Sequence, residues 1–198
     1  MENMNLKEIK LLLNKSNQVI NQLVSDEKVH ETISKIVEEI VECFKMGNKV
    51  IAAGNGGSAS DAQHFVGELV SRFNFDRPPL NAITLNSNTA VLTAIGNDYG
   101  YESLFSRQIS GLGKRGDIFI AYSTSGESKN ILNALSIARD LNIITIAMSG
   151  SRQSSMRSLC NYYIEVPSEE TPLIQEGHAI IGHVICALVE KEIFADMD

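Results

Sequence analysis

Short apolar runs that alternate with helical patterns are the feature of this sequence that most constrains its fold. Strand-like runs lie at residues 49–53, 81–85, 117–122, 143–148 and 162–166. Three of them show too little polar alternation for a sheet with one wet face, which indicates strands buried on both faces of a parallel sheet. Helical spacing predicts helices at about 58–74, 88–112, 128–141, 152–159 and 172–194. The sequence therefore predicts an α/β fold with a doubly wound parallel sheet, which binds ligands where loops leave the carboxyl ends of strands.

The N-terminal part of the chain has a different pattern. Between residues 5 and 46, apolar side chains recur at helical spacing, which predicts two amphipathic helices, and Gly47 suits the end of the second one. No internal repeat, low-complexity tract or linker interrupts the chain. We therefore expect a single domain over residues 1–198, with N-terminal helices at 1–47 and an α/β core at 48–198.

Composition limits the partners and the compartment. The formal net charge is −7 and Lys and Arg form no block, which argues against nucleic acid or an anionic membrane as the ligand. No secretory signal and no charge-free apolar run of membrane-spanning length is visible, so we expect a cytoplasmic protein. Cys43, Cys160 and Cys186 are odd in number and widely spaced, which favours buried free thiols over disulfides or a metal site.

Two loops have the composition of an anion site. Gly54-Asn55-Gly56-Gly57-Ser58 follows the first strand-like run, and Ser123-Thr124-Ser125-Gly126-Glu127-Ser128 follows the third. Glycines allow close approach of the backbone, and the N–H groups that open the next helix favour an anion. Each loop alone is also consistent with ordinary helix capping and turns. Two such loops after two buried strands favour a phosphate site, but neither matches the Walker pattern or a full dinucleotide fingerprint.

Ionisable side chains follow the first loop and recur in the last helix. His64 and Glu68 are four residues apart, so a helix places them on one face, next to whatever the loop holds. The alternative is a solvated surface pair. Gln175 and His183 lie about 80° apart around a helix and share a broad face. His178 lies further round, and we expect it to be partly exposed and not a ligand.

Together these segments resemble a known family. The motifs GNGGSASDAQHFVGEL, AIGNDYGYESLFSRQ, STSGESKNIL and VPSEETPLIQEGHAIIGHVI resemble those of the sugar isomerase (SIS) fold, and specifically the phosphoheptose isomerases, over essentially the whole chain. The resemblance implies a five-stranded parallel sheet flanked by helices and a homotetramer with active sites at subunit interfaces. It implies conversion of sedoheptulose 7-phosphate to D-glycero-D-manno-heptose 7-phosphate through an enediol(ate), for heptose units of bacterial lipopolysaccharide core.

The resemblance also implies roles for individual residues. Glu68 would be the carbon base and His183 its acid–base partner, with support from Asp61. One zinc ion per subunit would be held by His64, Glu68, Gln175 and His183, a set in which the amide oxygen is the unusual ligand. Substrate contacts would come from Asn55, Gly56, Gly57, Ser58, Glu68, Arg72, Asn97, Asp98, Ser123, Thr124, Ser125, Ser128 and Gln175.

Some of these assignments have simpler alternatives. Asp61 could compensate the dipole at a helix N-terminus, and Arg72 could be a solvated helix residue. Where some family members carry a charged residue before the motif glutamine, this chain has Thr171-Pro172-Leu173-Ile174, which leaves sugar contacts from that stretch open.

Two other functions fit the same fold. One is a non-catalytic SIS protein that resembles the replication-initiator-associating factor and acts through a protein partner. The presence of both Glu68 and His183 favours the enzyme over this alternative. The other is an isomerase of an arabinose or hexose phosphate, whose family members often carry a further domain for which 198 residues leave no room.

Overall fold

A five-stranded parallel sheet forms the centre of the molecule. The computed structural model describes residues 4–194. The strands lie in the order β2-β1-β3-β4-β5, and all four neighbouring pairs are parallel. Their bounds are β1 Val50–Ala53, β2 Ala82–Thr84, β3 Ile118–Tyr122, β4 Ile144–Ser149 and β5 Tyr162–Glu165. The predicted α/β class with a parallel sheet is confirmed, and each strand lies within two residues of its predicted range.

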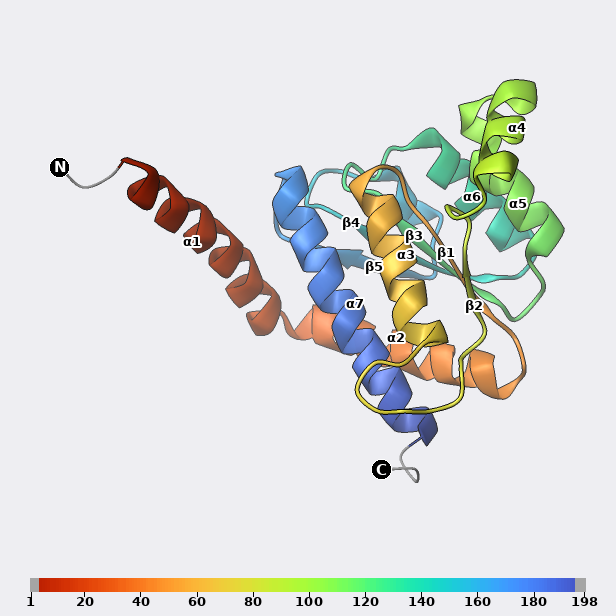
Figure 1. The fold of residues 1–198 in the computed structure, drawn as a ribbon, viewed down its shortest axis with the longest axis horizontal. Coiled ribbons are helices and arrows are strands. Elements are labelled where there is room, and N and C mark those ends of the chain that lie inside the picture. The colour runs from red at the N-terminus through yellow and green to blue at the C-terminus, as the bar shows by residue number, and fades with distance from the viewer. Residues whose placement is uncertain (1–3, 195–198) are drawn as a thin grey trace.

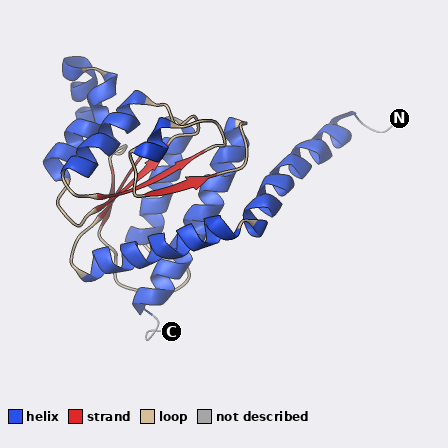
Figure 2. Ribbon diagram, turned by 180° about the vertical axis from the view of Figure 1, so that it is seen from behind, coloured by secondary structure: helices blue, strands red, loops and turns tan. Residues whose placement is uncertain are grey.

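Helices cover both faces of this sheet (Figures 1 and 2). One face packs against α2 (Glu27–Lys45), α3 (Gly57–Val70) and α7 (Thr171–Phe194), whose buried side chains join one core cluster. The other face packs against α5 (Leu104–Leu112) and α6 (Lys129–Asp140), which belong to a second cluster. Right-handed crossovers between parallel strands place helices on both faces in this way.

The central strands are buried on both faces, which explains why their sequences are continuous apolar runs. Along β3, Ile118, Ile120 and Tyr122 contribute to the first cluster, whereas Phe119 and Ala121 contribute to the second. All five residues are at most 1% exposed. Both sets of alternating side chains are therefore buried, and neither face of the strand needs polar residues.

Three helix predictions are wrong in detail. The single helix predicted at 88–112 is three elements: α4 (Thr89–Tyr99), a 3₁₀ turn at Tyr101–Ser103, and α5. Gly100 separates them with φ +82°, a conformation that glycine adopts readily and that ends α4. The helix predicted at 152–159 is only a 3₁₀ turn, Ser155–Ser158. The helix predicted at 58–74 ends at Val70.

The two terminal helices contrast with each other. Helix α1 (Met4–Ser25) extends away from the body of the molecule and exposes apolar side chains such as Leu6, Ile9 and Leu12 (Figure 1). Helix α7 is long and apolar enough to cross a membrane by length and composition, but it packs against α2 and α3 in the first core cluster. Its apolarity is therefore that of a core helix.

The cysteines are free thiols, as predicted. Cys43 and Cys186 are buried, whereas Cys160 is only half-buried. Burial raises the pKa of the Cys160 thiol to about 11, against a smaller opposing effect of Arg157. The thiol is therefore protonated near neutral pH.

Candidate active site

The two predicted anion loops lie side by side at the carboxyl edge of the sheet. One follows β1 and the other follows β3, and these two strands are hydrogen-bonded neighbours. Helices α3 and α6, which follow the loops, begin without a side-chain cap, whereas Asp26 and Asn88 cap α2 and α4. The first turns of α3 and α6, next to the two loops, are thus left available for an anion.

The loop after β3 is folded around its own hydroxyl groups. Ser123 Oγ donates to Ser128 Oγ at 3.1 Å, and Ser125 Oγ accepts from the Glu127 amide at 3.2 Å. Gly126 has φ +68°, and a Cβ there would lie 2.0 Å from Ser154 Oγ. The loop therefore needs glycine at this position for both conformation and space.

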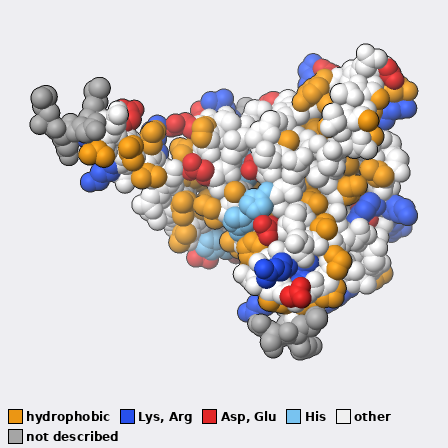
Figure 3. Space-filling model, viewed as in Figure 1, with side chains coloured by type: hydrophobic (Ala, Val, Ile, Leu, Met, Phe, Trp, Pro, Cys, Tyr) orange, Lys and Arg blue, Asp and Glu red, His pale blue; other side chains and the backbone are white. Residues whose placement is uncertain are grey.

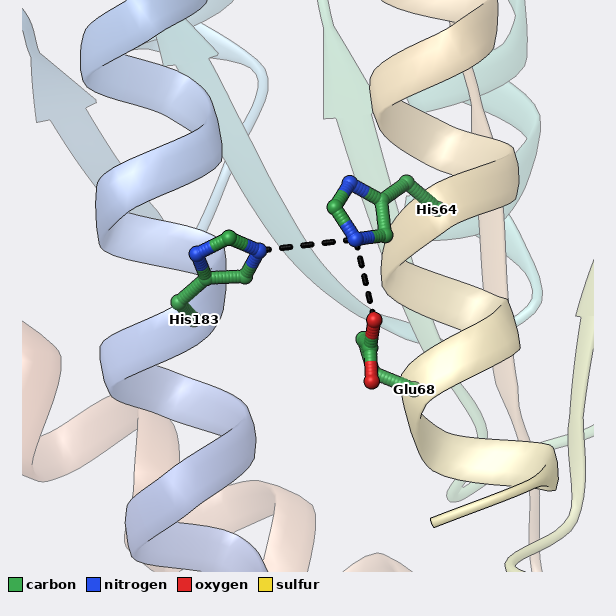
Figure 4. A group of neighbouring side chains, drawn as sticks. All are labelled: His64, Glu68 and His183. Atoms are coloured by element: carbon green, nitrogen blue, oxygen red, sulfur yellow. Dashed lines mark hydrogen bonds and ion pairs between the residues drawn. The ribbon is translucent and has the colours of Figure 1, made fainter. Parts of the chain in front are cut away.

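Three ionisable side chains meet where α3 and α7 run side by side (Figure 4). His64 Nε2 lies 2.9 Å from Glu68 Oε1, across one turn of α3, and 3.4 Å from His183 Nε2 on α7. One ligand atom from each of the three residues lies within 4.8 Å of the other two. The structure thus brings together three of the four residues that the resemblance assigns to zinc.

This group is open to solvent. His64 and His183 are exposed and Glu68 is half-buried, and histidine side chains gather with an acidic one on this face of the molecule (Figure 3). Two imidazoles and a carboxylate are common zinc ligands, and catalytic zinc sites keep an open position for water or substrate. The donor set and its exposure therefore fit a catalytic zinc ion.

Gln175 lies at the other end of the same helix pair. A Cβ at Gly57 would lie 2.2 Å from the Gln175 amide nitrogen, so the start of α3 and the first turns of α7 approach closely at these two residues. The amide therefore lies next to Gly57, the first residue of α3.

A buried ion pair anchors the C-terminal end of α3 to α7. Arg77 Nε donates to Glu190 Oε1 at 3.0 Å, with both side chains 1% exposed. Arg77 Nη2 donates to the carbonyl oxygen of Glu68 at 2.8 Å, and Glu190 also accepts from the Phe73 and Asn74 amides. Because the buried charges have hydrogen-bond partners, the pair holds the backbone that carries Glu68 in place.

The inward side of the helix pair holds a second polar group, and it corrects the prediction for His178. This histidine is buried, 1% exposed, and faces a small cavity that Asp61 and Tyr122 also line. As expected, His178 lies on a different side of α7 from His183. That side faces the sheet, so His178 is buried. Its ring packs edge-on against Tyr122, with centroids 5.6 Å apart.

Burial sets the ionisation of this inward group. It lowers the pKa of His178 to about 4, against a smaller effect of the Ser149 backbone, and raises the pKa of Asp61 to about 6, against an opposing effect of His64. Within residues 4–194, neither ring nitrogen of His178 nor Asp61 Oδ2 has a partner at hydrogen-bonding geometry. Burial therefore shifts both groups toward their neutral forms, so that His178 is neutral at pH 7 whereas Asp61 is still mostly ionised there.

Three predicted substrate residues lie elsewhere in this chain. Asn97 and Asp98 are exposed at the end of α4, where Asn97 Nδ2 donates to Asp98 Oδ1 at 2.8 Å. Arg72 is exposed in the loop that follows α3. These residues are not part of the group formed by His64, Glu68 and His183.

Sequence reasoning missed the side chains that hold the first loop. Asn86, after β2, binds both the amide and the carbonyl of Gly54, at 3.2 and 2.8 Å. Asn130 of α6 and Tyr101 bind the Asn55 side chain. The sequence shows only that asparagines occur near these loops. It does not show that Asn86 contacts Gly54 or that Asn130 contacts Asn55, because the partners lie 32 and 75 positions apart.

Comparison with known proteins identifies the family. The profile of the SIS domain matches residues 13–150. The chain is 49% identical over 194 residues to a phosphoheptose isomerase of Burkholderia pseudomallei, with 98% of each chain covered, and 53% identical over 176 residues to phosphoheptose isomerase 2 of Campylobacter jejuni, with 89% and 88% covered. The structure of a phosphoheptose isomerase from Francisella tularensis superposes with a TM-score of 0.90 at 34% identity, covering 96% of this chain and all of that one. The chain belongs to the phosphoheptose isomerase family.

Membership of this family decides between the classes of function. The protein is an isomerase with an SIS domain, and its reaction belongs to the isomerisation of sugar phosphates. The alternative of a non-catalytic SIS protein is not favoured, because relatives matched over nearly their full length are enzymes.

Proposed function

We propose that this enzyme converts sedoheptulose 7-phosphate to D-glycero-D-manno-heptose 7-phosphate. The observation that carries the proposal is that His64 and Glu68 lie on the helix that starts from the first anion loop and meet His183 of α7 there. A phosphate bound at the loops would leave the sugar chain to extend toward this group. The printed names of the relatives support a heptose phosphate as substrate.

The reaction moves two protons and needs no external oxidant or reductant. In the proposed mechanism Glu68 removes a proton from C1 of the ketose and returns it to C2 of the enediol(ate). His183 takes the proton of the C1 hydroxyl and delivers it to the oxygen on C2, so that the aldehyde forms at C1. A carboxylate and an imidazole suit these roles near neutral pH.

The same residues fit a metal ion. We propose that His64, Glu68 and His183, with Gln175 as the fourth ligand, hold one zinc ion per subunit. When bound, zinc supplies Lewis acidity that polarises a carbonyl and stabilises negative charge on neighbouring sugar oxygens. Asp61 is proposed to support the site from the inward side.

The remaining substrate contacts are proposed on the two loops and beyond them. The phosphate would be held by Ser123, Thr124, Ser125 and Ser128, and the sugar by Asn55, Gly56, Gly57 and Ser58. We further propose a cytoplasmic homotetramer, in which each chain is one SIS domain over residues 1–198 and supplies heptose for lipopolysaccharide core. The exposed apolar side chains of α1 support oligomerisation, and Arg72, Asn97 and Asp98 would then serve a site at a subunit interface.

The test follows deuterium from solvent into the sugar. Protein supplied with zinc is incubated with sedoheptulose 7-phosphate in D₂O and the sugars are followed by NMR. We expect aldose carrying deuterium at C2, and neither product nor exchange with Glu68→Gln, whose amide is nearly isosteric but is not a comparable base. Glu31→Gln removes a carboxylate from an exposed position on α2 and is the matched control.

Two outcomes would contradict the proposal. Full activity of Glu68→Gln would remove this residue from the proton transfer. Binding of the sugar phosphate by wild-type protein without conversion or exchange would favour the binding-protein alternative instead.

A further inference from the structure

The side chain of Asn55 is held by two other segments of the chain. Asn55 Nδ2 donates to Asn130 Oδ1 at 2.9 Å, and Asn130 Nδ2 donates back to Asn55 Oδ1 at 2.9 Å. The Tyr101 hydroxyl donates to the same Asn55 oxygen at 2.8 Å. Asn130 is 2% exposed, so its amide would be costly to leave without partners.

These contacts determine how Asn55 can interact with a ligand. An amide oxygen has two acceptor positions, and both are occupied here, by Asn130 and by Tyr101. The amide nitrogen has two N–H groups, and Asn130 takes only one of them. Asn55 is therefore left as a hydrogen-bond donor, which recognises an acceptor oxygen of a phosphate, hydroxyl or carbonyl group.

The pair also connects the two anion loops. Asn55 belongs to the loop that follows β1, whereas Asn130 lies in the first turn of α6, directly after the loop that follows β3. On the opposite side, Asn86 binds both backbone polar groups of Gly54. A turn that contains three glycines is flexible by itself, so these side chains set its position relative to the neighbouring loops.

We propose that Asn130 is a positioning residue of the sugar-phosphate site, which orients the Asn55 amide as a donor to a ligand oxygen and fixes the spacing of the two loops. The inference rests on the proposed function, because it assumes that a sugar phosphate bridges these loops. Asn130 acts through Asn55 and does not itself need to touch the ligand.

The experiment is a double-mutant cycle on ligand affinity. The Kd of sedoheptulose 7-phosphate is measured by calorimetry in the Glu68→Gln background, where the ligand is not converted. We expect Asn130→Ala and Asn55→Ala each to weaken binding about 10-fold, the effect of one lost hydrogen bond of ordinary strength. If Asn130 acts through Asn55, the double variant is no weaker than Asn55→Ala alone.

A matched control separates positioning from a general loss of structure. Asn161 also holds backbone through its side chain, accepting from the Thr145 amide at 2.9 Å, but it lies at the amino end of β5, away from the loops. Asn161→Ala should lower the melting temperature and leave the Kd unchanged. Should Asn130→Ala be recovered only unfolded, Asn130→Ser keeps a small hydroxyl donor and takes its place in the cycle.

Additive losses in the double variant, or an unchanged Kd for Asn130→Ala, would overturn the inference. Full loss of affinity from Tyr101→Phe with none from Asn130→Ala would assign the role to Tyr101 instead. Conversion of the sugar by wild-type protein is measured separately by NMR. Binding without conversion would therefore contradict the proposed function and leave this cycle interpretable.

Discussion

The outward and inward sides of the α3–α7 pair carry the same kinds of residue in opposite environments. Outward, His64, Glu68 and His183 meet at the surface, where solvent stabilises charge. Inward, Asp61 and His178 face a small cavity that the outward group also borders, and burial shifts both of their pKa values toward the neutral form. Residue type and helical spacing are thus insufficient to identify chemistry, because the environment decides which group can carry charge.

The largest expected effect concerns the activity that depends on His183, on the outward side of α7. His183→Gln should lower kcat/KM about 10²–10⁴-fold, the usual contribution of a general acid or base. The melting temperature should change little because the side chain is exposed. Steady-state kinetics and thermal unfolding measure the two effects. His30→Gln, on the exposed side of α2, is the control, and equal losses in both variants would contradict the assignment.

The second effect concerns the pH dependence of stability on the inward side. The folded pKa of His178, about 4, lies below its ordinary value of 6.5, so its contribution is fully present above pH 6.5 and is lost as the pH falls toward 4. Wild-type protein should lose about 3 kcal/mol more stability than His178→Leu between pH 7 and pH 4.

Urea unfolding of both proteins at each pH measures this difference. Asp61, Tyr122 and Cys186, together with His64, Glu68 and His183, line the same cavity in both proteins, so the two chains differ there only in the imidazole at position 178. Parallel stability curves for the two proteins would show that His178 is protonated in the folded state.

A third effect tests the outward group as a metal site. Zinc at about 100 times its Kd should raise the free energy of unfolding by about 2.7 kcal/mol, because only the folded chain brings the ligands together. Thermal unfolding with and without a chelator measures this increase. His64→Asn should abolish it and His178→Leu should retain it. The reverse pattern would place the metal on the inward side.

The smallest effect concerns Asp61. Its folded pKa of about 6 lies above the ordinary 3.8, so its contribution is fully present below pH 3.8 and is lost as the pH rises through 6. Asp61→Asn should therefore gain stability relative to wild type between pH 4 and pH 7, by about 2 kcal/mol after allowance for partial solvent screening. Denaturant titrations at the two pH values measure it, and an unchanged difference would indicate a carboxyl group that is ionised throughout.

The sheet could be predicted from sequence because its strands are buried on both faces. Such strands read as uninterrupted apolar runs, and those at 118–122 and 144–149 were found to within a residue. The helical pattern at 88–112 misled because apolar spacing continues across Gly100, where only the backbone conformation changes. Local periodicity does not show such a break.

Only the part of the site that lies on a single helix could be predicted from the sequence. His64 and Glu68 follow from spacing on one helix, but helix α7 is apolar on most sides, so its sequence does not show which face the sheet covers. His178 was therefore expected to be partly exposed and is buried. The Asn55–Asn130 pair joins residues 75 positions apart, and no local pattern predicts such a contact.

The close approach of Gly57 and Gln175 ties two motifs of the sequence to each other. A Cβ at position 57 would meet the end of the Gln175 side chain, so a larger residue there requires the amide to move away. Among related chains, a larger residue at 57 is compatible only with a shorter or displaced residue at 175. The glycine-rich motif and the helix that carries the proposed metal ligands should therefore covary at this pair, and redesign of either segment has to treat both as one unit.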